Sequence, residues 1–139
     1  MTFTIEKMDI FNVPQGYYLA HCISSDFALG AGIAKRFDEV YNMRYKLFRD
    51  YDEGCVGEAL LVDNVFNLVN KQYKYDDATY EELAASLTDM RETMKYLAIT
   101  KLAMPKIGCG RDGLEWAKVE ELIKLVFDGM DVQIMICEL

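Results

Sequence analysis

The stretch AMPKIGCGRDG, residues 103–113, joins an apolar segment to an amphipathic one and holds three glycines within its last six positions. Gly108 to Gly113 fits the pattern G-x-G-x-x-G, the phosphate-binding fingerprint of dinucleotide-binding folds. Those folds place the fingerprint in their first strand–helix–strand unit and an acidic residue at the end of the next strand. Here the match lies near the C-terminus, only one strand is predicted after it, and Asp131 precedes that strand. The stretch therefore does not indicate NAD binding, and another kind of phosphate site is the better interpretation.

Hydrophobic periodicity around this stretch predicts strands that alternate with helices. The clearest helix, 80–97, carries apolar residues at steps of three and four, and Thr79 with Glu82 forms a capping box at its start. Asp63-Asn64 suits a hairpin turn. The predicted strands are 2–5, 17–23, 59–62, 65–69, 101–104 and 132–137, and the predicted helices are 33–41, 45–51, 80–97 and 116–127. One domain, residues 1–139, is expected to form an α/β sandwich around a mostly parallel or mixed sheet.

Composition narrows the classes of ligand and of compartment. The net charge of −8 disfavours non-specific binding to nucleic acid or membranes, but backbone N–H groups can still hold a small anion. The chain has neither a long apolar run nor a signal pattern, so a cytoplasmic protein is expected. A basic cluster is interpreted as a solvated helix face: Lys35, Arg36, Arg44, Lys46 and Arg49. Four cysteines without metal-ligand spacing are expected to be buried free thiols: Cys22, Cys55, Cys109 and Cys137.

A second glycine turn, Gly30-Ala31-Gly32, also follows an apolar strand and begins a helix. Two such corners at one edge of a sheet would direct two sets of backbone N–H groups into a common cleft, a geometry that suits the two anionic groups of a diphosphate. The competing interpretation is that the glycines only permit tight turns. The occurrence of both corners favours the phosphate site.

Five segments together resemble a macrodomain: LAHCIS (19–24), GAGIAKRF (30–37), LVNK (68–71), TYEEL (79–83) and MPKIGCGRDGLEW (104–116). The resemblance covers essentially the whole chain. It is nearest to the terminal ADP-ribose protein glycohydrolase type, which is related to antitoxin macrodomains that remove ADP-ribose from DNA. It implies a three-layer α/β/α macrodomain with a mixed central sheet that binds ADP-ribose. AHCIS and ALGAGIA stand where the larger glycohydrolase and deacylase group carries asparagines and a longer glycine run, so a mechanism based on those asparagines is not supported.

The resemblance also implies which residues bind the ligand. Asp9 corresponds to the family's aspartate that accepts a hydrogen bond from the adenine amino group, although Met8 replaces the glycine that usually precedes it. The turn 30–34 corresponds to the loop around the diphosphate and distal ribose, and 107–111 to the opposing phosphate loop. His21 is interpreted as a core or pocket-wall histidine and not as a base, Cys109 as a small pocket-lining residue and not as a nucleophile, and Trp116 as a packing residue. The expected substrate-binding residues are Asp9, Ile10, His21, Ser24, Gly30, Ala31, Gly32, Ile33, Ala34, Pro105, Ile107, Gly108, Cys109, Gly110 and Arg111.

Lys71 and Asp112 match the catalytic pair of the glycohydrolase type, with Lys71 as nucleophile and Asp112 as acid and base. Taken alone, Lys71 would be a solvated loop lysine, and Asp112 with Glu115 would be a capping box for the last helix. The resemblance implies a hydrolase that removes ADP-ribose from an O-linked or base-linked adduct.

Alternatives to this function are an ADP-ribose-1″-phosphate phosphatase, an O-acyl-ADP-ribose deacylase and a non-catalytic ADP-ribose reader. No metal or cofactor is expected. The expected partners of this monomer are ADP-ribose or ADP-ribosylated protein, acyl group or nucleobase, with no membrane and with nucleic acid only as a modified substrate.

Overall fold

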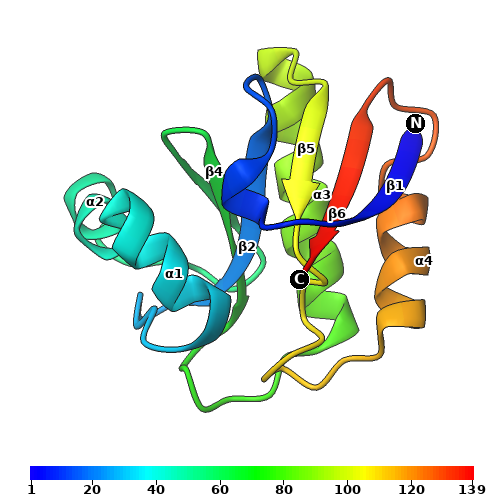
Figure 1. Cartoon of the computed structure of the whole chain (residues 1–139). Helices are drawn as coiled ribbons and strands as arrows, with labels where there is room; N and C mark the ends of the chain where they lie inside the picture. The colour runs from blue at the N-terminus through cyan, green and yellow to red at the C-terminus, as the bar shows by residue number, and fades with distance from the viewer.

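Six strands form one sheet in the order β1-β6-β5-β2-β4-β3 in the computed structural model, which describes residues 1–139 (Figure 1). Every neighbouring pair is parallel except β3–β4, which is an antiparallel hairpin. The carboxyl ends of five strands therefore meet at one edge of the sheet. The strands are β1 (Thr2–Lys7), β2 (Tyr18–Ser24), β3 (Ala59–Val62), β4 (Val65–Lys71), β5 (Lys101–Met104) and β6 (Gln133–Glu138).

Helices cover both faces of the sheet, with α1 and α2 on one side and α3 and α4 on the other (Figure 1). Side chains alternate between the two faces along β4: Val65 and Val69 pack with α1 and α2, whereas Phe66 and Leu68 pack with α3 and α4. The three-layer α/β/α architecture with a mixed sheet is thus confirmed. The helices are η1 (Ile10–Asn12), α1 (Gly32–Tyr41), α2 (Met43–Asp50), α3 (Tyr80–Leu97) and α4 (Trp116–Val126).

Each predicted element is present, with ends that differ by a few residues. Helix α3 begins and ends as predicted, and Thr79 Oγ1 accepts a hydrogen bond of 3.2 Å from the backbone N–H of Glu82. In the hairpin turn Asp63 adopts the left-handed conformation, with φ 53°. Strands β2 and β4 continue to Ser24 and Lys71, beyond the last apolar residue in each.

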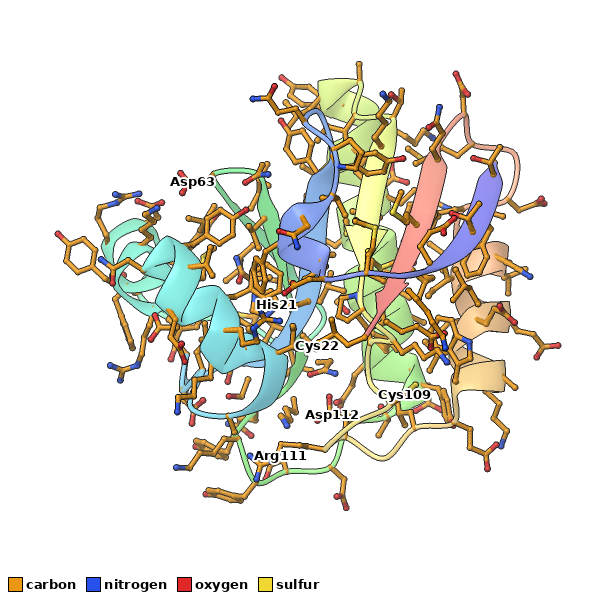
Figure 2. The ribbon with its side chains drawn as sticks, in the orientation of Figure 1. His21, Cys22, Asp63, Cys109, Arg111 and Asp112 are labelled. Atoms are coloured by element: carbon orange, nitrogen blue, oxygen red, sulfur yellow. The ribbon has the colours of Figure 1, made fainter.

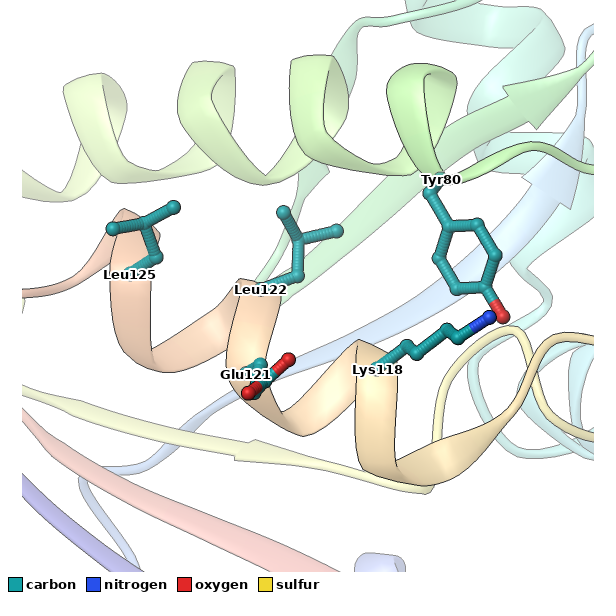
Figure 3. A pocket seen from close by; sticks show the side chains of 5 residues that line it. All are labelled: Tyr80, Lys118, Glu121, Leu122 and Leu125. Atoms are coloured by element: carbon teal, nitrogen blue, oxygen red, sulfur yellow. The ribbon is translucent and has the colours of Figure 1, made fainter.

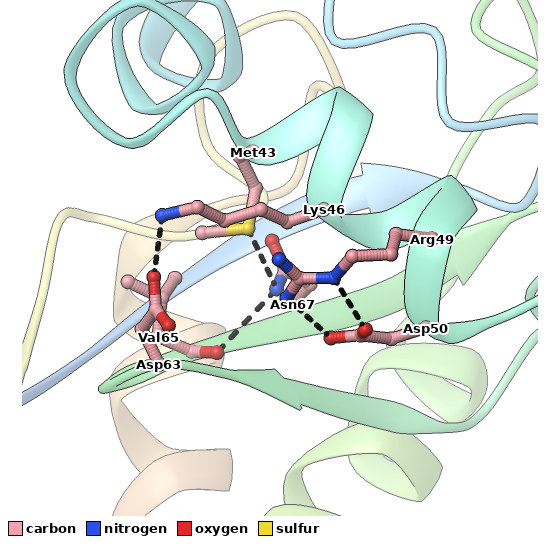
Figure 4. Close-up of polar contacts among 7 residues, drawn as sticks. All are labelled: Met43, Lys46, Arg49, Asp50, Asp63, Val65 and Asn67. Carbon is pink, nitrogen blue, oxygen red and sulfur yellow. Dashed lines mark hydrogen bonds and ion pairs between the residues drawn. The ribbon is translucent and has the colours of Figure 1, made fainter.

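Two composition-based expectations need correction. The basic cluster is not simply solvated, because three of its five members form ion pairs: Arg36 with Asp9 at 2.8 Å, Lys46 with Asp63 at 2.7 Å and Arg49 with Asp50 at 2.8 Å (the last two are drawn in Figure 4). The four cysteines are free, but only Cys137 is buried: Cys22 and Cys109 are partly buried, and Cys55 is exposed because it lies in the loop before β3, outside both hydrophobic clusters. No helix is both long and apolar enough to span a membrane.

A polar network is embedded in the layer between the sheet and the α1–α2 pair. Asn67 of β4 donates from Nδ2 to the carbonyl of Leu60 at 3.0 Å, and its Oδ1 lies 2.6 Å from Nε2 of His21. The His21 ring stacks on Phe37 of α1 with 4.0 Å between ring centroids. The network therefore joins β2, β3, β4 and α1 within the core.

Candidate active site

A cleft of about 740 Å³ opens at the carboxyl edge of β2, β4 and β5. Three connections surround it: residues 25–31 after β2, 72–79 after β4 and 105–115 after β5, which gather at the lower end of the molecule in Figure 1. Parallel neighbours place these connections at the same edge, which is where open α/β sheets bind ligands. Most of the predicted site residues line the cleft: Ser24, Gly30, Ala31, Gly32, Ile33, Ala34, Lys71, Pro105, Ile107, Gly108, Gly110, Arg111 and Asp112.

Lys71 and Asp112 form an ion pair in this cleft although they are far apart in the sequence. Lys71 Nζ lies 2.6 Å from Asp112 Oδ1, and the two side chains are only 13% and 11% exposed. Lys71 ends β4, and Asp112 lies on the loop after β5, at the end of the sheet toward which β2 runs (Figure 2). A nearly buried amine and a nearly buried carboxylate in contact can pass a proton directly from one to the other, without bulk water.

The capping-box interpretation of Asp112 is wrong. Helix α4 begins after Glu115, and no side chain caps it. Both carboxylate oxygens of Asp112 are already engaged, Oδ1 by Lys71 and Oδ2 by the amide Nδ2 of Asn70 at 2.9 Å. The carboxylate is therefore committed to the cleft and not to the helix.

The glycines of the two loops serve different purposes. Gly108 has a left-handed backbone, with φ 73°, and a Cβ there would lie 2.9 Å from Leu114 Cδ1, so the turn itself requires glycine. Gly30 and Gly110 have no left-handed backbone, and a Cβ on either would meet nothing closer than the Ala28 carbonyl oxygen at 3.8 Å. A tight turn does not explain these two exposed glycines, whereas close approach of a ligand to the backbone does. No side chain caps the N-terminus of α1, which leaves its N–H groups facing the cleft.

The structure does not support the prediction that His21 binds substrate. It is fully buried, does not line the cleft, and lies between α1 and the sheet (Figure 2). Burial lowers the pKa of His21 to about 4, so the ring is neutral at physiological pH. Of the two interpretations, core or pocket-wall histidine, the first is correct, because Phe37 and Asn67 enclose the ring in the layer between the sheet and α1.

Cys109 does not line the cleft either, because its thiol turns back and donates to the carbonyl of Ile107 at 3.3 Å. Cys22 does line the cleft, although the sequence did not identify it. Burial, followed by the nearby charge of Asp112, raises the pKa of the Cys22 thiol. Neither cysteine is thus placed and ionised as a nucleophile.

Asp9 and Ile10 lie outside the lining of the cleft, on the short segment after β1. The Asp9 carboxylate caps η1 by accepting from the N–H of Phe11 at 3.0 Å, and it pairs with Arg36 Nη2 at 2.8 Å. The hydrogen bond from Arg36 is the main cause that lowers the pKa of Asp9. Ile10 is buried in the core. Adenine recognition by Asp9 stays a prediction, and the carboxylate would have to share its bond to Arg36.

Further lining residues were not found from the sequence. The polar ones on the connection after β4 follow Lys71 closely, which is the signal that could have revealed them. The additional lining residues are Cys22, Ile23, Ala28, Leu29, Lys74, Tyr75, Asp76, Asp77 and Lys106. Asn70, which holds Asp112, was also missed, because it directly follows the predicted apolar strand 65–69 and so looks like the first residue of the connection.

A second cavity, of about 460 Å³, lies between α3 and α4 (Figure 3). It is lined by Tyr80, Lys118, Glu121, Leu122 and Leu125. Its leucines face α3, and its charged side chains lie on the exposed surface of α4. No group of three or more His, Cys, Asp or Glu side chains is arranged to hold a metal ion anywhere in the chain.

Comparison with known proteins gives agreement at the level of family and of fold. A family model described as Macro domain matches residues 54–123. ADP-ribose glycohydrolase OARD1 of Homo sapiens is 35% identical over 135 residues, which cover 96% of this chain and 89% of that protein. DNA ADP-ribosyl glycohydrolase of Mycobacterium tuberculosis is 25% identical over 123 residues, 78% of this chain and 34% of that protein. The solved structure of the macrodomain of Mycobacterium tuberculosis DarG matches with a TM-score of 0.86 and 22% identity, over 99% of this chain and 98% of that one.

Proposed function

The chain belongs to the macro domain family, and we propose that it is an ADP-ribosyl hydrolase, which binds ADP-ribose in the cleft and releases it from an O-linked or base-linked adduct. A relative that is 35% identical over 96% of this chain is named an ADP-ribose glycohydrolase. The observation that carries the proposal is the 2.6 Å pair of Lys71 and Asp112, nearly buried at the strand ends of the cleft. An amine and a carboxylate in contact are the groups that covalent catalysis at a sugar carbon requires.

In the first step Lys71 acts as nucleophile at C1″ of the distal ribose. Its ammonium first gives a proton to Asp112, which frees the amine electron pair. A bond then forms between Nζ and C1″ while the bond from C1″ to the acceptor breaks. The acceptor leaves with that electron pair and takes the proton from Asp112. Lys71 is then joined to ADP-ribose through a charged secondary amine, and Asp112 is again a carboxylate.

In the second step Asp112 acts as general base for water. It removes a proton from the water molecule as the oxygen adds to C1″, and the bond from C1″ to Nζ breaks with its electron pair returning to the lysine. Asp112 then returns the proton to Lys71, which restores the ion pair. The sum of the two steps is adduct plus water giving free ADP-ribose and the protonated acceptor.

The same cleft could serve a phosphatase or deacylase acting on ADP-ribose-1″-phosphate or O-acyl-ADP-ribose. A reader that only binds ADP-ribose is the other alternative. Burying an ion pair costs desolvation, which binding of a sugar does not require. The nearly buried pair therefore favours hydrolysis over binding alone. The relatives act on ADP-ribose and DNA adducts according to their names, so both protein-linked and DNA-linked adducts belong in the test.

The test compares Lys71→Ala and Asp112→Asn with the parent on ester-linked and DNA-linked ADP-ribose. Both variants should lose turnover and keep affinity for ADP-ribose, because neither group contributes much to ground-state binding. Asp112→Asn should form the adduct slowly, because Lys71 must then lose its proton to solvent, but the adduct should persist on the peptide that contains Lys71, because no base activates water. Mass spectrometry of the intact protein and of its fragments detects it. Lys118→Ala is the matched control, since Lys118 is 61% exposed on α4 and lies outside the cleft.

The outcomes separate the candidate functions. Turnover retained in Lys71→Ala would exclude the covalent route and favour direct attack by water with Asp112 as base. Tight binding of ADP-ribose by a parent that hydrolyses no adduct would leave only the reader. Release of phosphate or of a free acyl acid at a higher rate than release from protein or DNA would support the same-fold alternatives.

A further inference from the structure

Asn70 sits at an irregularity in the sheet beside the ion pair. Ile23 of β2 is paired with Val69 of β4, but the next residue, Ser24, is paired with Lys71, so Asn70 is the extra residue of a bulge. Successive side chains of a regular strand point to opposite faces, which would separate those of residues 70 and 71. A bulge redirects side chains and is common beside active sites.

Because of this bulge, two consecutive residues reach the same carboxylate. Asn70 Nδ2 donates to Asp112 Oδ2 at 2.9 Å, and Lys71 Nζ lies 2.6 Å from Asp112 Oδ1. The two oxygens are therefore divided between a neutral donor and a charged one. The neutral amide preserves the one-to-one charge balance of the pair, which a second cation or a second carboxylate at this position would disturb.

The burial of Asn70 is not explained by packing. Its side chain is fully buried, and its Oδ1 has no hydrogen-bond partner. Leucine has a similar shape and would fill the same space without an unpaired acceptor, so an asparagine that is only half satisfied requires another reason. The one bond that Asn70 makes with its side chain is the bond to Asp112.

Asp112 needs such support because of where it lies. Its neighbours Arg111 and Gly113 are exposed, and the loop has glycines on both sides of the carboxylate, at 110 and 113. A carboxylate on this loop can rotate or drift from Nζ unless the sheet holds it. Asn70 holds the carboxylate from β4, the strand that also carries Lys71. One rigid strand therefore fixes the positions of both Lys71 and Asp112.

We propose that Asn70 is a positioning residue for hydrolysis, which holds Asp112 at the orientation needed to exchange protons with Lys71. This inference rests on the proposed function. Asn70 does not touch the ligand, since it does not line the cleft, and it acts through Asp112. Its loss should slow the chemical step while leaving ADP-ribose binding intact, because displacement of a catalytic group by about 1 Å costs about 100-fold in rate.

Two variants of nearly the same shape test the proposal, with the parent assayed alongside. Asn70→Leu removes the donor, and we expect kcat to fall about 100-fold with KM and ADP-ribose affinity unchanged. The double variant Asn70→Leu with Asp112→Asn should be no slower than Asp112→Asn alone, because both changes act on one group. Asn70→Asp replaces the donor by an acceptor, and its activity relative to the parent should rise as pH falls from 8 to 5. One carboxyl of a close pair holds a proton more tightly than an isolated carboxyl, and the protonated group can donate.

Several results would overturn the proposal. If Asn70→Leu folds and keeps kcat within a factor of two of the parent, Asn70 is structural only. The same conclusion follows if Asn70→Asp loses stability and activity with a pH profile parallel to that of the parent. A parent without hydrolytic activity removes the proposed function and this role together, whereas an active parent with active variants removes this role alone.

Discussion

His21 gives a prediction that depends on the fold and not on the reaction. It is the only histidine of the chain, it is fully buried, and burial lowers its pKa from 6.5 to about 4. The hydrogen bond to Asn67 opposes the shift but does not cancel it. In the unfolded chain the ring takes up a proton near pH 6.5. Between pH 6.5 and pH 4 the unfolded state therefore binds more protons than the folded state, and the free energy of unfolding falls as pH falls.

The size of this effect follows from the two pKa values. A difference of about 2.5 corresponds to about 3 kcal/mol when the titration is complete, and about 2 kcal/mol is lost between pH 7 and pH 5. The stabilisation is present in full above pH 6.5 and is lost through the window down to pH 4. A domain of this size has a free energy of unfolding of roughly 5–15 kcal/mol, so the loss is easily measured.

The assay is urea denaturation of the parent and of His21→Gln at pH 7 and at pH 5. Glutamine is neutral at both pH values and can donate an amide hydrogen to Asn67 Oδ1, although it loses the ring stacked on Phe37. His21→Gln should be less stable than the parent at pH 7, but it should lose about 2 kcal/mol less on going to pH 5. Carboxylates titrate in both proteins and cancel in this difference. Equal losses in the two proteins would show that His21 is not held neutral by burial.

The remaining predictions concern ligand binding. Gly30→Val should fold normally, because the backbone at this position tolerates a side chain. It should weaken ADP-ribose binding about tenfold or more in calorimetry, since the side chain would keep the ligand from the backbone. Unchanged affinity would refute the assignment of this turn as a phosphate site. Gly32→Val is a poorer probe, as φ 59° would strain any side chain. If Asp9 binds the adenine amino group, Asp9→Ala should bind ADP-ribose more weakly, and the parent should bind the inosine analogue, which lacks that amine, more weakly than ADP-ribose. Arg36→Leu should then bind ADP-ribose more tightly than the parent, because Arg36 no longer competes for the carboxylate; weaker binding would mean that Arg36 itself contacts the ligand.

The fold could be predicted well where the apolar pattern is strong. Both ends of helix 80–97 are predicted correctly, because its buried positions recur at helical spacing and Thr79 marks its start. Strands β2 and β4 were ended too early, because Ser24, Asn70 and Lys71 are polar. Polar residues at the end of a buried strand look like the beginning of a loop in the sequence. Here they belong to the strands because Ser24 of β2 pairs with Lys71 of β4 beyond the last apolar residues.

The site could be predicted as a set of residue types but not as a geometry. The sequence presents Lys71 and Asp112 in separate segments, and only the neighbouring positions of β2, β4 and β5 bring those segments to one cleft. Asn70 could not be found, because the register shift that redirects it arises from pairing with β2. Strand alternation alone could not exclude His21, because Ile23 lies on the same face of β2 and does line the cleft. His21 lies further from the carboxyl end of the strand, where Phe37 and Asn67 enclose its ring.

The false match to the dinucleotide fingerprint has a physical explanation in this structure. In a dinucleotide fold the first glycine of the motif permits a tight turn and the second lets the backbone approach the diphosphate. Gly108 and Gly110 meet the same two conditions: one has a left-handed backbone, and the other is exposed with free space where a side chain would be. The motif departs from that fold afterwards, since α4 begins only at Trp116 and the intervening segment carries Asp112 into contact with Lys71. A short glycine pattern therefore indicates only a turn that an anion can approach closely. The residues that follow the pattern determine which reaction takes place there.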